Sequence, residues 1–220
     1  MYQAVLFDLD DTLYDLRAYW TGRLERAFAG LAPRYPQLDR GTLIRRAIAE
    51  KVYMQQMPAF LRQLEVEDEV LIEQIRAQYC DGWFEELVLD VEAIHVFRRL
   101  QPHMRLGLVT NGPSFTQRAK IERFGLADAM DVIVVSGEVG IAKPDPAIFQ
   151  IALEQLGTTP AQSLYIGDSI ENDLYGAAAA GMPFVWINRR NEQFPDGAPL
   201  PIAMITHLAE LPPLIEKQAL

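Results

Sequence analysis

The chain begins with a short apolar run and continues with a long periodic segment. Residues 4–9, AVLFDL, are mostly apolar and β-prone, which is typical of a strand buried on both faces of a sheet. From about residue 14 to residue 92, apolar positions recur at spacings of three and four, which indicates amphipathic helices. This part of the sequence therefore predicts one strand followed by a block of helices.

After residue 93, short apolar runs alternate with periodic segments. Asp145 is a suitable N-cap, Pro146 fits the first position of a helix, and Gly157 can close its last turn. Gly125 is a similar candidate C-cap for the preceding helix. The pattern predicts strands within MRLGLVTNG, DVIVVSG, SLYIGD and PFVWIN, and helices within SFTQRAKIERFGL, DPAIFQIALEQLG, ENDLYGAAAAGM and residues 206–218.

Strands that alternate with helices of this length are typical of a parallel sheet with helices on both faces. The predicted fold class is therefore α/β, with a Rossmann-like, doubly wound parallel sheet as the core and an inserted α-helical domain. The core would comprise residues 1–13 and 93–220, and the inserted domain would comprise residues 14–92.

Composition narrows the expected partners and compartment. The formal net charge of -10 argues against nucleic acid as a partner, because phosphate backbones select basic surfaces. Cys80 is the only cysteine, so neither an intrachain disulfide nor a cysteine zinc site is expected. No apolar stretch approaches the ~20 residues that cross a bilayer, and the N-terminus lacks a signal-peptide pattern. We expect a cytoplasmic protein, monomeric or homodimeric, that binds neither nucleic acid nor membrane.

Polar residues follow the predicted strands at the ends where open parallel sheets bind ligands. Any one of these groups alone is typical of a turn, a helix cap or an exposed loop. Their occurrence in order at successive strand ends instead favours a common site. The residues are Asp8 and Asp10, then Thr110, Asn111 and Gly112, then Ser136, Gly137 and Lys143 in the following loop, and finally Asp168 and Asp173.

The acidic members of this set indicate a metal. Asp8 and Asp10 are two positions apart on a strand, so their carboxylates can share one face. Without compensation they would repel each other, and one would take up a proton. A divalent cation removes the repulsion, and Asp168 would supply a third oxygen ligand. An all-oxygen carboxylate site suits Mg²⁺ better than Zn²⁺.

The remaining members indicate a phosphoryl group. Lys143 offers a positive charge, Thr110 offers a hydroxyl, and the N–H groups near Asn111 and Gly112 precede a helix start, which favours anions. Phosphoryl transfer needs positioning and charge neutralisation more than elaborate covalent chemistry. A carboxylate can act there as the nucleophile, and a second one can act as general acid and base.

The ordered set resembles the haloacid dehalogenase superfamily of aspartate-nucleophile phosphohydrolases. Its first motif is matched by DLDDT at 8–12, its second by Thr110 in LVTNG, its third by Lys143 in AKPDP, and its fourth by GDSIEND at 167–173. The resemblance spans residue 4 to about residue 188. The helical insertion is similar to the α-helical cap of the branch that contains phosphoglycolate phosphatases and dehalogenases, where the cap sets substrate specificity.

The resemblance implies a role for each matching residue. Asp8 would be the nucleophile and a Mg²⁺ ligand, and Asp10 the general acid and base, with its carbonyl also on the metal. Asp168 would be the remaining protein ligand of the metal. The other implied roles are phosphoryl binding by Thr110 and Lys143, backbone or amide contacts from Asn111 and Gly112, and support of Lys143 or metal-bound water by Asp173.

Other activities of the same superfamily remain open on the sequence alone. Dehalogenases of this superfamily lack the second aspartate of the first motif, so Asp10 favours phosphate ester hydrolysis over 2-haloacid dehalogenation. Phosphonate hydrolysis needs a cap lysine, and nothing distinguishes Lys51, the only lysine between residues 14 and 92. A phosphosugar mutase would use the same residues. A catalytically silent binding protein on this fold would not need all four groups of strand-end residues.

The substrate is expected to be a small phosphorylated metabolite, either a nucleotide 5′-monophosphate or a sugar phosphate. The sequence looks most like the branch that includes nucleotide 5′-phosphatases and acylneuraminate-9-phosphate phosphatases. One hypothesis is that Arg17 or Arg23 faces an anionic substrate. The preferred alternative is that both are solvated helix residues. Tyr14, Tyr19 and Trp20 follow the nucleophile closely and would stack on a base or sugar, or else belong to the core.

Overall fold

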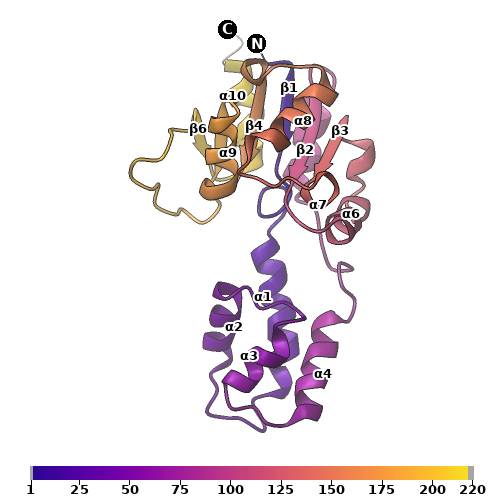
Figure 1. Cartoon of the computed structure of the whole chain (residues 1–220), viewed down its shortest axis with the longest axis vertical. Helices are drawn as coiled ribbons and strands as arrows, with labels where there is room; N and C mark the ends of the chain where they lie inside the picture. The colour runs from indigo at the N-terminus through magenta and orange to yellow at the C-terminus, as the bar shows by residue number, and fades with distance from the viewer. Residues whose placement is uncertain (1, 218–220) are drawn as a thin grey trace. The chain divides into compact units, whose positions relative to one another are not determined.

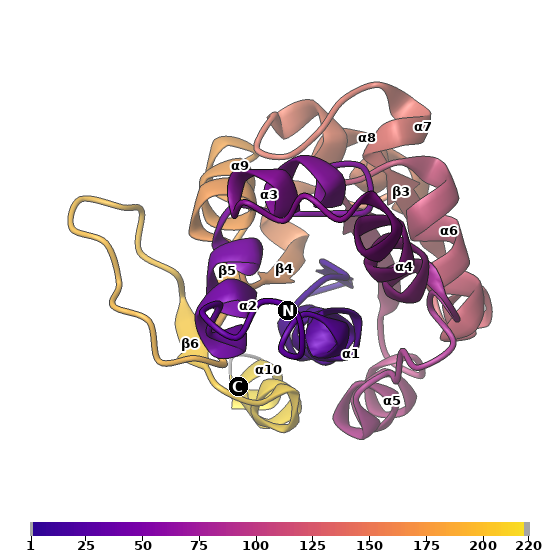
Figure 2. The same cartoon turned by 90° about the horizontal axis from the view of Figure 1, so that it is seen from below.

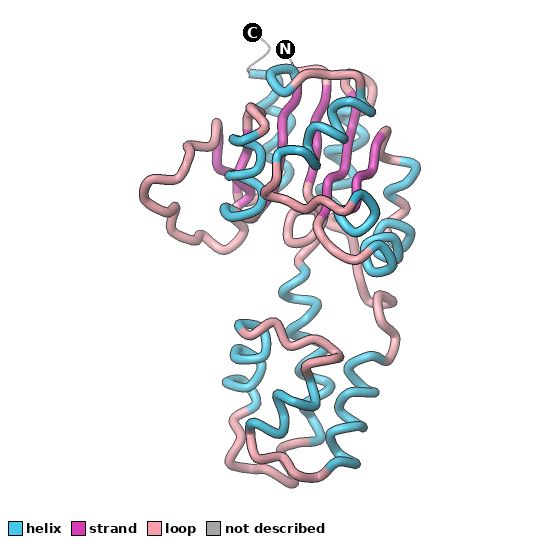
Figure 3. The backbone as a smooth tube through the Cα atoms, viewed as in Figure 1, coloured by secondary structure: helices cyan, strands magenta, loops and turns pink. Residues whose placement is uncertain are grey.

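The computed structural model describes residues 2–217 and comprises two compact units (Figure 1). One unit joins the N-terminal segment up to Asp15 with the chain from Val88 onward, and the other is Leu16–Leu87. Among the described residues, strands occur only in the first unit, and the second consists of helices and loops (Figure 3). The sequence pattern places the corresponding boundaries slightly differently, after residues 13 and 92.

Six strands of the described chain form one parallel sheet in the order β3-β2-β1-β4-β5-β6. The central strand β1 lies between β2 and β4, with Leu6 opposite Gly107 on one side and Tyr165 on the other. The sheet therefore grows outward in both directions from β1, which confirms the predicted doubly wound α/β fold. The strands are β1 Ala4–Phe7, β2 Arg105–Thr110, β3 Val132–Val135, β4 Ser163–Gly167, β5 Phe184–Ile187 and β6 Ala203–Ile205.

Helices cover both faces of this sheet. Figure 2 shows α8 and α9 on one side of the strands and α5 and α10 on the other. All four positions of β1 are buried, as expected for a strand with helices on both sides. The helices of the first unit are α5 Val91–Leu100, α6 Ser114–Arg123, α7 Ser136–Val139, α8 Pro146–Leu156, α9 Tyr175–Ala179 and α10 Leu211–Lys217.

Helix α8 illustrates how local sequence sets the ends of an element. The Asp145 carboxylate accepts the N–H of Ala147 at 2.9 Å, and Gly157 adopts a left-handed φ of 62° just beyond the last turn. Both predicted end signals are thus confirmed. Ile148, Phe149, Ala152, Leu153 and Leu156 form one buried face of α8, which packs in the core against the sheet.

Three parts of the first unit differ from the sequence pattern. Residues 91–100 form α5, whereas the pattern places the end of the helical insertion inside this stretch. Strand β6 is not among the predicted strands, because its three residues are too few to show an alternation of apolar and polar positions. The predicted helix over 171–182 begins instead as a π-helical turn, Ile170–Leu174, before α9. The reason is local: the carbonyl of Ser169 accepts the N–H groups of both Asp173 and Leu174.

The second unit has an apolar core of its own. Helix α1 contacts α2 and α4, and α3 contacts α4. Phe28, Met57 and Leu61 are among its fully buried side chains. Asp39 and Asp68 act as N-caps by accepting backbone N–H groups of α2 and α4, respectively. The helices are α1 Leu16–Ala27, α2 Arg40–Ala49, α3 Met57–Gln63 and α4 Glu69–Cys80.

None of the helices within residues 2–217 combines the length and the apolar character needed to span a bilayer.

Candidate active site

The carboxyl ends of three neighbouring strands bring the predicted residues together. Asp8 directly follows β1, and its N–H extends the pairing to β4 by donating to the carbonyl of Ile166 at 2.9 Å. Thr110 is the last residue of β2, and Asp168 is the first residue after β4. Because β1 lies between β2 and β4, these side chains share one edge of the sheet.

Three carboxylates converge at this edge. Oxygen atoms of Asp8, Asp168 and Asp173 all lie within 4.8 Å of one another. Burial and the neighbouring carboxylates raise the pKa of Asp8 to about 7, although Lys143 acts against the rise. Burial and the charges of Asp8 and Asp173 raise the pKa of Asp168 to about 9. A divalent cation would remove this cost of ionisation, so the donor set and its charge fit Mg²⁺.

Lys143 is the cationic centre of the site. Its buried ammonium group donates to Oδ1 of Asp8 at 2.6 Å, to Oδ1 of Asp173 at 2.7 Å and to the hydroxyl of Tyr165 at 2.9 Å. Burial lowers the pKa of Lys143, but the carboxylates of Asp173 and Asp8 outweigh that effect and raise the pKa above its ordinary value. All three N–H bonds of the ammonium are therefore engaged, and the lysine stays charged.

The side chain of Asn111 holds the loop that carries this lysine. Its Oδ1 accepts the N–H of Lys143 at 2.9 Å, and its Nδ2 donates to the carbonyl of the same residue at 2.9 Å. The N–H of Gly112 donates to Oγ of Ser136 at 2.9 Å. The amide of Asn111 and the N–H of Gly112 thus make intramolecular bonds that organise the loops, rather than pointing unpartnered toward a ligand.

The position of Asp173 depends on a glycine at the end of β4. A Cβ atom at Gly167 would lie only 2.4 Å from the carboxyl carbon of Asp173. Asp173 is almost fully buried, and its Oδ2 accepts the N–H of Ser169 at 2.9 Å. The π-helical turn and the missing side chain together allow its other oxygen to reach Lys143 and Tyr165.

Asp10 is surrounded by residues that the sequence reasoning did not connect to it. Lys120 donates to both of its carboxylate oxygens, at 2.7 and 2.9 Å. Gln117 donates to Asp10 at 3.1 Å and to the Thr110 hydroxyl at 2.5 Å, and Tyr14 donates to Asp10 through its hydroxyl. Gln117 and Lys120 are three positions apart in α6, a spacing that places both on one helix face. This spacing is the one feature of the sequence that could have linked Gln117 and Lys120 to each other.

Arg23 is neither solvated nor available to an anionic ligand. It is 2% exposed, and its guanidinium donates to the carbonyls of Tyr79, Asp81 at 2.7 Å and Gly82 at 3.3 Å. These carbonyls lie at the C-terminal end of α4, where helices leave acceptors without intrahelical partners. Both sequence hypotheses for Arg23 are therefore wrong, and it acts as a buried cap of α4.

The aromatic residues near the nucleophile also have structural contacts. Tyr14 is 1% exposed and packs on Phe124, with ring centroids 5.0 Å apart, so it belongs to the core of the first unit. The hydroxyl of Tyr19 accepts the N–H of Phe84 at 3.0 Å, and Trp20 packs on Tyr53 within the second unit. The backbone carbonyl of Arg17 accepts the Thr21 hydroxyl at 2.8 Å, and a contact of its guanidinium with substrate stays a prediction.

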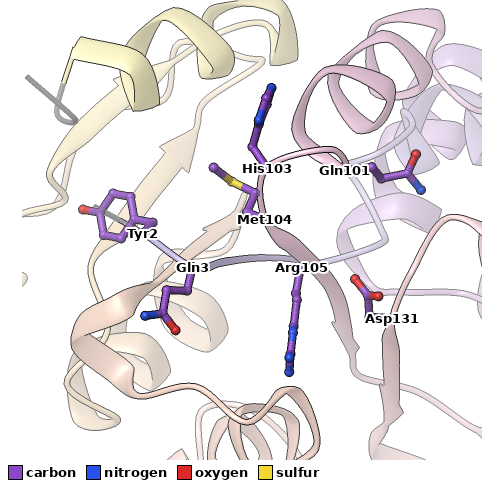
Figure 4. Close-up of a pocket in the computed structure, with 7 residues that line it drawn as sticks. All are labelled: Tyr2, Gln3, Gln101, His103, Met104, Arg105 and Asp131. Atoms are coloured by element: carbon purple, nitrogen blue, oxygen red, sulfur yellow. The ribbon is translucent and has the colours of Figure 1, made fainter.

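A separate hollow of about 530 Å³ lies where strands β1 and β2 begin, at the edge opposite the acidic cluster (Figure 4). It contains one carboxylate, that of Asp131, which accepts the N–H of Leu106 at 2.7 Å. The labelled side chains in Figure 4 point in different directions and share no common centre. This hollow lacks the convergent carboxylates and lysine of the strand-end site.

Several known proteins are similar in sequence to this chain. The chain is 36% identical over 126 residues to a pyrimidine 5′-nucleotidase of Escherichia coli, covering 57% of this chain and 56% of the relative. It is 35% identical over 133 residues to an N-acylneuraminate-9-phosphatase of Rattus norvegicus, covering 60% and 54%. The chain therefore spans about half the length of these curated relatives. Against a glyceraldehyde 3-phosphate phosphatase of Methanopyrus kandleri, identity is 30% over 202 residues, with 88% and 87% covered.

Solved structures show the same architecture. A HAD-hydrolase of Bacillus subtilis bound to magnesium superposes with a TM-score of 0.73 at 27% identity, covering 97% of this chain and 98% of that one. A 2-haloacid dehalogenase of Pseudomonas syringae pv. Tomato gives a TM-score of 0.65 at 26% identity, covering 99% and 100%.

The family model of haloacid dehalogenase-like hydrolases matches residues 2–181. That match includes all four groups of strand-end residues, and the doubly wound sheet places them at one edge. The chain belongs to the haloacid dehalogenase-like hydrolase family.

Proposed function

We propose that this protein is a Mg²⁺-dependent phosphatase that hydrolyses small phosphomonoesters through a phosphorylated Asp8. The observation that carries the proposal is the convergence of Asp8, Asp168 and Asp173 within 4.8 Å beside the buried ammonium of Lys143. Relatives named as a pyrimidine 5′-nucleotidase, an N-acylneuraminate-9-phosphatase and a glyceraldehyde 3-phosphate phosphatase support the reaction class.

Two half-reactions follow from this arrangement. In the first, a carboxylate oxygen of Asp8 attacks phosphorus, the bond from phosphorus to the ester oxygen breaks, and the departing oxygen takes a proton from Asp10. In the second, water attacks the same phosphorus, its proton passes to Asp10, and the bond to Asp8 breaks to release inorganic phosphate. Asp10 thereby regains the proton that it gives to the next leaving group.

Lys143 would hold a phosphoryl oxygen by turning one of its three N–H bonds away from the partner that it has here, and Thr110 would hold another through its hydroxyl. The Thr110 hydroxyl accepts a hydrogen bond from Gln117 at 2.5 Å, so its own proton remains available for a phosphoryl oxygen. Asp8, Asp168 and the carbonyl of Asp10 would hold Mg²⁺, which supplies neutralisation of phosphoryl charge when bound. Asn111 keeps Lys143 in place through its two backbone contacts.

Hydrolysis of phosphate esters fits this chain better than dehalogenation. Asp10 is present and held by three donor side chains, and a halide leaving group needs no such acid. A phosphosugar mutase would share these residues and is distinguished by its product, because it returns the phosphoryl group to the sugar instead of releasing phosphate. The absence of inorganic phosphate among the products would favour the mutase.

We also propose that the helical unit Leu16–Leu87 is the cap that sets substrate specificity. Nucleotide 5′-monophosphates and sugar phosphates are the expected substrates, in keeping with the names of the relatives. The cytoplasmic location and the monomeric or homodimeric state predicted from the sequence stay predictions.

The test is release of inorganic phosphate from a panel of nucleotides and sugar phosphates, with Mg²⁺ and with EDTA. Asp8→Asn should lower turnover on the order of 10⁴-fold without unfolding the protein. Asp131→Asn is a matched control, because this carboxylate lies at the opposite edge of the sheet. Retained turnover in Asp8→Asn, or equal turnover with EDTA, would refute the proposal.

A further inference from the structure

Lys120 is a buried lysine that lies outside the four family motifs. It is 5% exposed, and it belongs to α6, which begins four positions after Thr110. Burying an ammonium group is unfavourable unless a negative partner compensates it. The partner is Asp10, whose two carboxylate oxygens lie 2.7 and 2.9 Å from Nζ of Lys120.

The contacts of Asp10 fix the direction of its carboxylate. Oδ1 accepts from Lys120 and from the Tyr14 hydroxyl, and Oδ2 accepts from Lys120 and from Gln117 at 3.1 Å. All of these partners are donors, so Asp10 is held as an acceptor of hydrogen bonds. A quarter of its side chain stays exposed, which leaves it accessible to water.

Gln117 links this arrangement to the phosphoryl site. Its Nε2 donates both to Asp10 and to the Thr110 hydroxyl, the latter at 2.5 Å. One face of α6 therefore positions the proposed base and the proposed phosphoryl ligand together. Positioning of this kind matters because a small misplacement of a catalytic group lowers rates strongly.

We propose that Lys120 is a positioning residue that holds the Asp10 carboxylate as the base of the second half-reaction. This inference rests on the phosphatase function proposed above. In that step the water oxygen bonds to phosphorus, the bond between phosphorus and Asp8 breaks, and the water proton passes to Asp10. Lys120 itself exchanges no proton, and it acts only through its two hydrogen bonds to Asp10.

The test separates the two half-reactions with 4-nitrophenyl phosphate, whose leaving group departs without help from an acid. Lys120→Met should still release one equivalent of 4-nitrophenol per enzyme in a burst, at a rate within threefold of the parent. Its steady-state turnover should fall tenfold to a hundredfold, because a misplaced Asp10 slows the attack of water on phosphorylated Asp8. The burst itself shows that the variant is folded and can transfer the phosphoryl group.

Two further variants make the test specific. In an Asp10→Asn background, Lys120→Met should change neither phase by more than twofold, because Lys120 acts through Asp10. Arg118→Met is the matched control, since Arg118 is a cation of the same helix that pairs with Glu138 at the surface. It should leave both phases unchanged. If Lys120→Met does not fold, Lys120→Gln keeps a donor and should show a smaller fall in the same slow phase.

Each other outcome is decisive. Equal loss in burst and turnover, unchanged turnover, faster turnover, or a further loss in the Asp10→Asn background would each overturn the role of Lys120. A parent protein that releases no 4-nitrophenol with Mg²⁺ would instead refute the proposed phosphatase function, and the role of Lys120 with it.

Discussion

Asp173 occupies the space that a side chain at Gly167 would fill. A Cβ atom at Gly167 would lie 2.4 Å from the Asp173 carboxyl group, and the same group binds the ammonium of Lys143 at 2.7 Å. The glycine at the end of β4 is therefore a condition for the contact between Asp173 and Lys143.

Gly167→Ala should displace Asp173 and disturb the support of Lys143. We expect a loss of about 1–3 kcal/mol in the free energy of unfolding, as for other overpacked interiors, and a fall in turnover of at least tenfold. Urea titration and phosphate release measure the two effects. Gly22→Ala in α1 is the control, because its Cβ would meet only the end of Arg26 at 3.9 Å; a similar loss there would contradict the steric argument.

Asn111→Ala should weaken catalysis by releasing the backbone of Lys143. The variant loses both hydrogen bonds to that residue, which together contribute about 1–3 kcal/mol to the placement of the loop. We expect kcat/KM for phosphate release to fall roughly tenfold to a hundredfold. Ser114→Ala removes a nearby surface hydrogen bond to Glu138 and should have little effect. An Asn111→Ala variant as active as the parent would show that the loop carrying Lys143 keeps its position without the Asn111 side chain.

Arg23→Met should destabilise the helical unit around the end of α4. The substitution leaves the carbonyls of Tyr79, Asp81 and Gly82 without their buried donor. We expect a loss of about 2–4 kcal/mol and faster hydrogen exchange in the last turn of α4. Arg34→Met, which removes an exposed ion pair with Asp68, should cost under about 1 kcal/mol. Comparable effects of the two variants would argue against the capping role.

The metal-free protein should lose stability as the pH rises. Burial raises the pKa of Asp8 to about 7 and that of Asp168 to about 9, so the folded state retains protons that the unfolded state has released above about pH 4. The free energy of unfolding should therefore fall as pH rises from about 4 through 7 and on toward 9. Mg²⁺ should flatten this slope, because a bound cation compensates the ionised carboxylates.

Urea titrations between about pH 5 and pH 9, with EDTA and with Mg²⁺, measure this effect. Asp168→Asn should remove the upper part of the slope, whereas Asp131→Asn at the opposite edge should keep it. A slope that is the same with and without Mg²⁺ would contradict the assignment of these carboxylates as the cation site.

The sequence sufficed for the parts of the site that lie next to strands. Asp8, Thr110 and Asp168 each follow a short apolar run, and parallel strands bring their carboxyl ends to one edge. The fold class follows from the same alternation. The helix over 145–157 was predictable to its ends, because Asp145 and Gly157 act through contacts within their own turns.

The contacts that required the structure are those between distant segments. Gln117 and Lys120 share a helix face, but nothing in α6 alone says that this face meets Asp10 rather than solvent. Arg23 has the sequence environment of a surface residue and is buried because the end of α4 lies against it. The π-helical turn that aims Asp173 depends on two bonds to one carbonyl, a choice that helical periodicity does not register.

The two hydrogen bonds between Asn111 and Lys143 join the two ends of the segment that runs between these residues. That segment contains α6, β3 and α7, and it turns at Gly125, where an added Cβ atom would meet nothing within 4 Å. Because these bonds anchor both ends of the segment, extra residues inserted at the Gly125 turn would lengthen the segment without shifting Lys143. The Gly125 turn is thus a place where this protein can acquire new surface while the position of Lys143 is kept.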